Sequence, residues 1–213
     1  MNALKRFGPA VMAAVLACGL MAPAPALGDK GGKKKPPPQP LAGWEVTILQ
    51  PPIDDYDESV ALGASGGQQV GYVITNDGYG HAGIWTGTAA SWVDLHPAQF
   101  ERSTAYGVGD GQQVGVASVF DWNRYERIDH AILWTGTGWV DLHPAQYEIS
   151  RAYAIDGGRQ VGEAGSPPGM THAGLWTGTA ESWVDLHPYD SGWGFSGAYG
   201  ICGNQVVGDI TGN

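Results

Sequence analysis

The sequence predicts an all-β fold of tandem four-stranded antiparallel sheets arranged as propeller-like blades. One motif, His-Ala-x-x-Trp, occurs three times, and each copy is followed by Trp-Val-Asp-Leu-His-Pro. Each unit of about 45 residues holds four short runs rich in β-branched residues, aromatic residues and glycine, without a helical period. Four strands in a repeat of this length are typical of propeller blades. The copies of the motif begin at His81, His130 and His172.

Residues 1–26 are predicted to be a secretory signal peptide. A basic dipeptide precedes the apolar run Ala10–Met21, which at 12 residues is too short to cross a bilayer as a helix. Residues 24–26, Ala-Pro-Ala, have the pattern of a cleavage site. The alternative is a lipid anchor on Cys18, because the preceding Val-Leu-Ala partly matches a lipoprotein box. We therefore expect a secreted, periplasmic or extracellular protein.

Residues 27–40 are predicted to be a linker, because lysine, glycine and proline build no packed core. Residues 41–213 contain 5 arginines against 20 acidic residues, a formal charge of −15. Such a field repels nucleic acid and anionic membrane surfaces. The composition therefore excludes nucleic acid as a partner, and no segment is predicted to be a transmembrane helix.

The repeat domain, residues 41–213, ends in an incomplete unit. Trp44–Gln50 is expected to form a lone fourth strand, which can join the last two strands and close an imperfect fourth blade. A unit left open exposes a strand edge, so we expect self-association through that edge. Cys202 is predicted to be packed within a strand. The units are expected at about 59–102, 103–150, 151–196 and 197–213.

The repeated hairpin predicts a ladder of side chains on one face. In the second unit, Gly136 suits the first central position of a two-residue turn that pairs Trp134 with Trp139. Counting outward, His130 then faces His143. The other copies contain two more loop residues, which leaves each side chain on the same face because the strand period is two.

Two interpretations of this ladder are open. Two imidazoles and a carboxylate on one face suit zinc or a similar ion. Alternatively, the histidines and the aspartate hydrogen-bond within the blade beside the paired tryptophans. Because the same letters recur in every unit, we expect the second arrangement and predict no cofactor. The candidate metal ligands are His81, Asp94, His96, His130, Asp141, His143, His172, Asp185 and His187.

The loops between second and third strands, and between successive units, differ among the copies, whereas the other turns barely change. In an antiparallel blade these two variable sets emerge on the same side. Variable loops on a rigid frame commonly carry binding sites. The candidate ligand-binding residues are therefore Trp122, Arg124, Tyr125, Arg127, Tyr189 and Trp193.

From Leu41 onward the sequence resembles the HAF family of extracellular repeats from secreted bacterial proteins. The resemblance rests on His-Ala-x-x-Trp, Trp-Val-Asp-Leu, Ala-Tyr-Gly followed by Gln-Val-Gly, and the unit length. It implies secretion and a β-propeller-like fold, and it implies no activity. Gly83, Ile132 and Gly174 stand where the family has Phe.

No catalytic constellation is found in the sequence. There is no Gly-x-Ser-x-Gly nucleophile elbow, and nothing singles out a pair of carboxylates for glycosidic chemistry. We therefore predict a non-enzymatic binding or interaction module at the cell envelope or outside the cell, with carbohydrate or protein as the partner. The alternative is a truncated piece of a larger propeller-type envelope enzyme, a hydrolase or a lyase.

Overall fold

The computed structural model describes residues 45–52, 56–136, 138–166, 170–189 and 194–212, and these residues form an all-β fold without an α-helix. Two short 3₁₀ turns, Ala89–Ser91 and Ala180–Ser182, fill the loops with the two-residue insertions. The strands are β1 (Tyr56–Ser65), β2 (Gln68–Thr75), β3 (Gly80–Trp85), β4 (Val93–Asp94), β5 (Arg102–Gly109), β6 (Gln112–Asp121), β7 (Glu126–Thr135), β8 (Gly138–Asp141), β9 (Ile149–Asp156), β10 (Arg159–Gly165), β11 (Thr171–Trp176), β12 (Val184–Asp185), β13 (Phe195–Cys202) and β14 (Gln205–Thr211).

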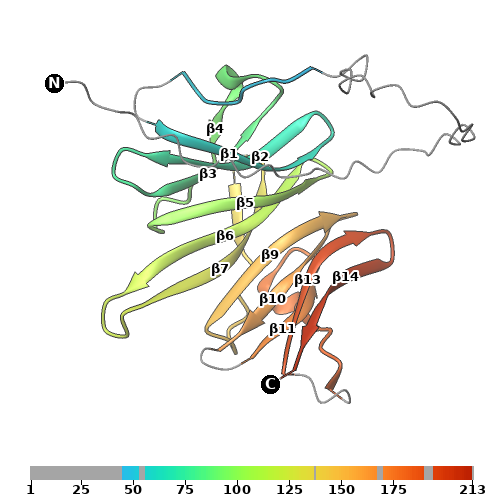
Figure 1. The fold of residues 1–213 in the computed structure, drawn as a ribbon. Coiled ribbons are helices and arrows are strands. Elements are labelled where there is room, and N and C mark those ends of the chain that lie inside the picture. Colours follow the sequence, from blue (N-terminus) through green and yellow to red (C-terminus); the bar gives the residue numbers. More distant parts are fainter. Residues whose placement is uncertain (1–44, 53–55, 137, 167–169, 190–193, 213) are drawn as a thin grey trace, which may run out of the picture. The chain divides into compact units, whose positions relative to one another are not determined.

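The strands form three four-stranded antiparallel sheets and one two-stranded sheet. Sheet 1 contains β1–β4, sheet 2 β5–β8, sheet 3 β9–β12 and sheet 4 β13–β14, each with its strands in chain order. Figure 1 shows the sheets following one another from cyan to red along the chain. The predicted unit of four antiparallel strands is therefore confirmed for three units.

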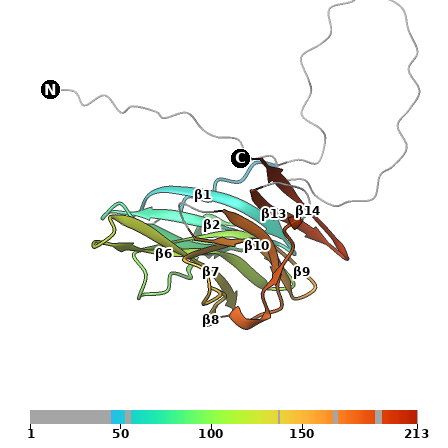
Figure 2. The same cartoon turned by 90° about the horizontal axis from the view of Figure 1, so that it is seen from below.

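The hydrophobic core consists of three layers, each between two consecutive sheets. Val70 and Ala82 of sheet 1 pack with Ile132 and Trp134 of sheet 2. A second layer joins Val114 and its neighbours in sheet 2 to sheet 3. A third layer joins sheet 3 to β13. Figure 2, a view turned by 90°, shows β2, β10 and β13 in this stack.

The repeated Gln-Val-Gly has a steric cause. A Cβ atom at Gly115 on β6 would lie 1.9 Å from the carbonyl oxygen of Thr104 on β5. The same position in the other units, such as Gly162, meets the first strand just as closely. Only glycine fits there without moving the neighbouring strand.

The repeated Ala-Tyr-Gly coincides with a β-bulge. In each first strand the residue after the alanine has no partner in the register of the second strand. In three sheets this residue is a tyrosine, and the rings form a row: Tyr106 and Tyr153 are 5.4 Å apart between centroids, and Tyr153 and Tyr199 are 5.1 Å apart. The first strands of successive sheets therefore lie next to one another.

The paired tryptophans of the repeated hairpin pack within the sheets, as the hairpin pattern predicts. Trp134 pairs with Trp139 across β7 and β8, and Trp134 is 1% exposed. In sheet 1, the Trp92 ring lies directly over Gly83, where any Cβ would be 2.2 Å from it. Gly174 in sheet 3 has the same relation to its tryptophan, which explains glycine at the third motif position in these two units.

The predicted lone strand at the amino-terminal side does not form. Residues 45–50 have no strand conformation, and Val46 and Ile48 are 93% and 79% exposed. Trp44 lies outside the described residues, as do the leader and the linker. The prediction of an imperfect three-stranded fourth blade is wrong, because sheet 4 holds only β13 and β14 among the described residues.

Cys202 is exposed, so the prediction that it is packed is wrong. It lies beside the β13–β14 turn, opposite Gln205 of β14, a strand whose residues are all exposed. In the part of the chain that the structure describes, no helix has the length and apolar character needed to cross a membrane.

Candidate functional site

The histidines and aspartates of the repeat form a hydrogen-bonded ladder in each four-stranded sheet. In sheet 1, Asp94 Oδ2 lies 2.9 Å from His81 Nδ1, while Asp94 Oδ1 accepts the backbone N–H of His96 at 2.7 Å. The two imidazole rings stack with 3.9 Å between centroids. The ladders of sheets 2 and 3 have the same contacts and stack at 4.1 Å.

The second histidine of each ladder connects two sheets. His96 Nε2 lies 3.0 Å from the carbonyl oxygen of Phe100, which can only accept, so this nitrogen carries the proton. His96 Nδ1 therefore accepts from Ser103 Oγ at 2.8 Å. Ser103, on β5 of the next sheet, in turn accepts the N–H of Ala82 on β3 at 2.9 Å. The same link joins sheet 2 to sheet 3 and sheet 3 to sheet 4.

These links use the neutral form of the histidine. Burial, and then the neighbouring ring of His81 or His130, lowers the pKa of His96 and His143 below the usual value. The linking serines are 1%, 0% and 4% exposed at Ser103, Ser150 and Ser196, so none reaches a substrate as a nucleophile. Within the described ranges, no group of three or more His, Cys, Asp or Glu is placed to hold a metal ion.

The variable loops contain a pocket of about 340 Å³, which we call the loop pocket. Three of the sequence-predicted residues, Trp122, Tyr125 and Arg127, line it. They lie at the tip of the β6–β7 hairpin, where Phe120 packs edge-on against Trp122 at 4.8 Å and against Tyr125 at 5.6 Å between centroids. Trp122 and Tyr125 remain 72% and 78% exposed. The complete lining is Tyr79, Glu101, Arg102, Phe120, Trp122, Tyr125 and Arg127.

The hairpin tip is held in a defined conformation. Asp121 Oδ1 accepts the backbone N–H of Asn123 at 2.8 Å, as in an Asx turn. Tyr125 has φ +59°, a left-handed conformation that a non-glycine residue adopts at a cost. Arg102, from the other wall of the pocket, lies over the Tyr79 ring at 5.4 Å. In the described part of the chain, neither Arg102 nor Arg127 forms an ion pair.

Arg124 and Tyr189, two of the other predicted ligand-binding residues, do not line the loop pocket. Arg124 points elsewhere and pairs with Glu148 at 2.8 Å. Tyr189 donates to Asp185 at 2.5 Å, and this hydrogen bond raises the pKa of Tyr189 to about 12. Tyr189 also packs edge-on against His172 and belongs to the ladder of sheet 3. Trp193 lies outside the described residues.

A charge network that the sequence analysis did not identify joins sheet 2 to sheet 3. Arg151 Nε donates to Asp129 at 2.7 Å, and Arg151 Nη1 donates to Glu163 at 2.8 Å. Tyr153 OH donates to the same Glu163 oxygen at 2.7 Å, and Ser118 OH donates to Asp129 at 2.6 Å. Both carboxylate residues are 8% exposed. Burial lowers the pKa of Arg151, but the two carboxylates raise it more, so the guanidinium stays charged.

This network lies near a second pocket of about 460 Å³, which shares Arg102 and Arg127 with the loop pocket and reaches Asp129 and Tyr106. The sequence signal for the charge network is that its acidic residues depart from the repeat. When the units are aligned by strand register, Asp129 occupies the position of Gly80 in sheet 1. Glu163 likewise occupies the position of Val116 in sheet 2. Each of these buried carboxylates occurs in one unit, so the fold common to all units does not require it.

The chain was compared with protein-family models, curated proteins and solved structures. None of them matches it.

Proposed function

We propose that the chain is a secreted, non-enzymatic repeat protein of the HAF type that binds saccharides with acidic groups at the cell envelope or outside the cell. In this proposal the stacked sheets are the blades of a propeller-like array, and the loop pocket is the binding site. The export signal is the pattern in residues 1–26. The three confirmed four-stranded units support the array.

The exposed aromatic cluster beside two arginines is the observation that carries this function. A water-exposed Trp122 and Tyr125 offer flat apolar faces, which pack well against the C–H faces of sugar rings. Arg102 and Arg127 offer planar donor groups that match a carboxylate or sulfate. Most of the domain is acidic and repels anions, so two arginines without ion pairs in one pocket favour an acidic ligand there.

The pocket is also arranged before any ligand arrives. The rings of Phe120, Trp122 and Tyr125 support one another edge-on, and the Asx turn at Asp121 fixes the backbone beneath them. Little side-chain freedom is then lost on binding, which favours affinity.

The test is binding of the full chain to immobilised uronic-acid polymers and to neutral polysaccharides of similar linkage. We expect saturable binding to the acidic set, and roughly tenfold or greater weakening by Trp122→Ala or Arg127→Ala. Arg124→Ala is the matched control, because Arg124 lies on the same hairpin but pairs with Glu148 outside the pocket.

We expect Arg124→Ala to change affinity by less than about twofold, since an exposed ion pair contributes little. Equal losses for Arg124→Ala and Arg127→Ala would contradict the assignment of the pocket. Failure to bind any acidic polymer would contradict the ligand class.

A further inference from the structure

The second strand of sheet 4 has an unpaired edge, whereas the corresponding edge in sheets 1, 2 and 3 pairs with a third strand. In sheets 1, 2 and 3 the second strand pairs with the first strand on one side and with the third strand on the other. β14 is the second strand of sheet 4, and among the described residues it pairs only with β13. The equivalents of Val206 are Gln113 and Gln160, which are 3% and 0% exposed, whereas Val206 is 37% exposed.

A groove lies next to this edge. The equivalent space between the other sheets is filled by a tryptophan of the following sheet. Leu142, at the end of the outer strand of sheet 2, is 0% exposed and belongs to one core cluster with Trp176 of the next sheet. Leu95 of sheet 1 accepts the indole N–H of Trp134 from the next sheet at 2.7 Å. Leu186 is the equivalent residue of sheet 3, and it is 42% exposed.

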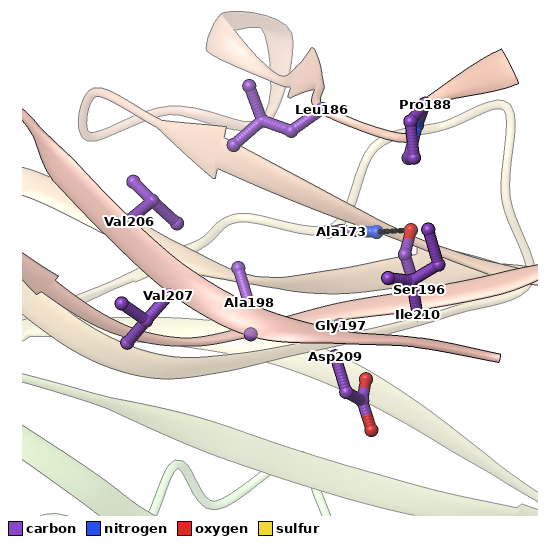
Figure 3. A pocket seen from close by; sticks show the side chains of 11 residues that line it. Ala173, Leu186, Pro188, Ser196, Gly197, Ala198, Val206, Val207, Asp209 and Ile210 are labelled. Atoms are coloured by element: carbon purple, nitrogen blue, oxygen red, sulfur yellow. Dashed lines mark hydrogen bonds between the residues drawn. The ribbon is translucent and has the colours of Figure 1, made fainter. Parts of the chain in front are cut away.

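The groove at Leu186 has a volume of about 310 Å³. Figure 3 shows Val206 and Ala198 pointing from sheet 4 toward the side of Leu186, while Asp209 points away. Pro188 and Ser196 complete the walls, and Ser196 Oγ already accepts the Ala173 N–H at 2.9 Å. The groove therefore has the apolar side chains of Leu186, Val206 and Ala198 in its walls, and the Ala173 amide beside it is already satisfied. It lies where the other sheets insert a tryptophan.

We propose that this groove and the free edge of β14 bind a β-hairpin of the repeat's own type. The first strand of the hairpin pairs antiparallel with β14, and its motif tryptophan enters the groove against Leu186. The three complete sheets argue for this occupant, because each contains that hairpin at that place. The proposal rests on sheet 4 alone and does not depend on the saccharide site.

The register of the added strand follows from sheet 3. There Val161 lies opposite Leu175, and Gln160 lies opposite Trp176. Gly162 and Gly208 occupy the same position, since each lies opposite the alanine that precedes the bulge of its first strand. Val207 is therefore predicted opposite the leucine of the hairpin, and Val206 opposite its tryptophan.

The first experiment uses a synthetic, fluorescently labelled peptide with the sequence of Thr171–Pro188, titrated with the full chain. We expect one saturable site per chain. Replacing Trp176 by Ala in the peptide should weaken binding by roughly 30-fold, as for a buried aromatic anchor. In the chain, Leu186→Glu should weaken it similarly, whereas Val184→Glu should leave it within about twofold. Val184 is 51% exposed and does not line the groove.

The second experiment tests the register by disulfide formation. The chain with Cys202→Ser and Val207→Cys is mixed with a peptide in which Leu175 is Cys. We expect rapid cross-linking, because directly opposite residues on paired strands lie close together. Val207 lines the groove, but its side chain is 65% exposed and points to the side opposite Leu186 (Figure 3), so the change leaves the wall that receives the tryptophan in place. Gln205→Cys, two residues off register, is the control and should cross-link far more slowly.

Absence of peptide binding would overturn the proposal, as would equal affinity of the Trp176→Ala peptide. A dimer joined through β14 that excludes the peptide would also overturn it, because the occupant would then be a second β14 edge. Equal cross-linking at positions 205 and 207 would refute the assigned register and thereby the repeat-type pairing.

Discussion

The links between sheets depend on one buried hydroxyl each, so Ser150→Ala should destabilise the protein strongly. Ser150 is 0% exposed, accepts the Ala131 N–H at 2.9 Å and lies 2.9 Å from His143 Nδ1. The substitution removes both hydrogen bonds and introduces no group that can replace them. The surrounding backbone of β7 and β9 is packed, so water has little access.

The expected magnitude follows from which groups lose their partner. Ala131 is 0% exposed, and leaving its N–H unpaired costs about 1–3 kcal/mol. His143 is half-buried and can regain part of its hydration, so loss of its hydrogen bond adds about 0.5–1 kcal/mol. Together the free energy of unfolding should fall by about 1.5–4 kcal/mol, a large share of a typical domain's stability.

Urea unfolding of the full chain, followed by tryptophan fluorescence, measures this change. The matched control is Ser182→Ala. Ser182 Oγ also accepts backbone N–H groups, from Thr177 at 2.8 Å and from Thr179 at 3.4 Å, and donates to the Thr179 carbonyl at 2.6 Å, but it lies in an exposed loop. Water replaces these bonds, so the control should cost less than about 1 kcal/mol.

The reasoning is refuted if the two serine substitutions have equal effects, or if Ser150→Ala costs less than about 1 kcal/mol. Either result would mean that the link between sheets contributes no more than a surface contact.

Three further substitutions or conditions test the other packing claims. Arg151→Met should cost about 3–5 kcal/mol, because it leaves two buried carboxylates without a counter-ion; adding Asp129→Asn and Glu163→Gln should recover much of this in urea unfolding. Gly115→Ala should cost at least about 3 kcal/mol, since its Cβ would lie 1.9 Å from a carbonyl oxygen, whereas Gly80→Ala, with 3.5 Å of room, should cost less than about 1 kcal/mol. Lowered pKa values of His96 and His143 mean that the unfolded chain binds more protons below about pH 6.5, so stability should be complete above that pH and fall as the pH decreases toward the folded-state values. The slope should reach at most about 1.4 kcal/mol per pH unit for each histidine, and a urea midpoint that is constant from pH 7.5 to 5 would contradict this.

The local features of each unit could be predicted from the sequence, because strand pairing within a hairpin depends on side-chain alternation and turn geometry. The pairing of Trp134 with Trp139, the stacked histidines and the four strands per unit all follow from letters close together in the chain. The loop pocket was found in part for the same reason, since variable loops on a repeated frame are visible in the sequence.

The tertiary structure decided what depends on contacts between units. The partner of His96 is a serine of the next sheet, and the charge network around Arg151 draws on two sheets, so spacing along the chain identifies neither. Arg124 and Arg127 are the same residue type in the same loop, so the sequence does not distinguish them. The conformation of the hairpin places Arg124 against Glu148 and Arg127 in the pocket. The sequence by itself determined which strands pair within a sheet, because that information is local. The packing of one sheet on the next decided which polar groups are buried, which are paired and which stay open to a ligand, because burial is a property of the assembled stack.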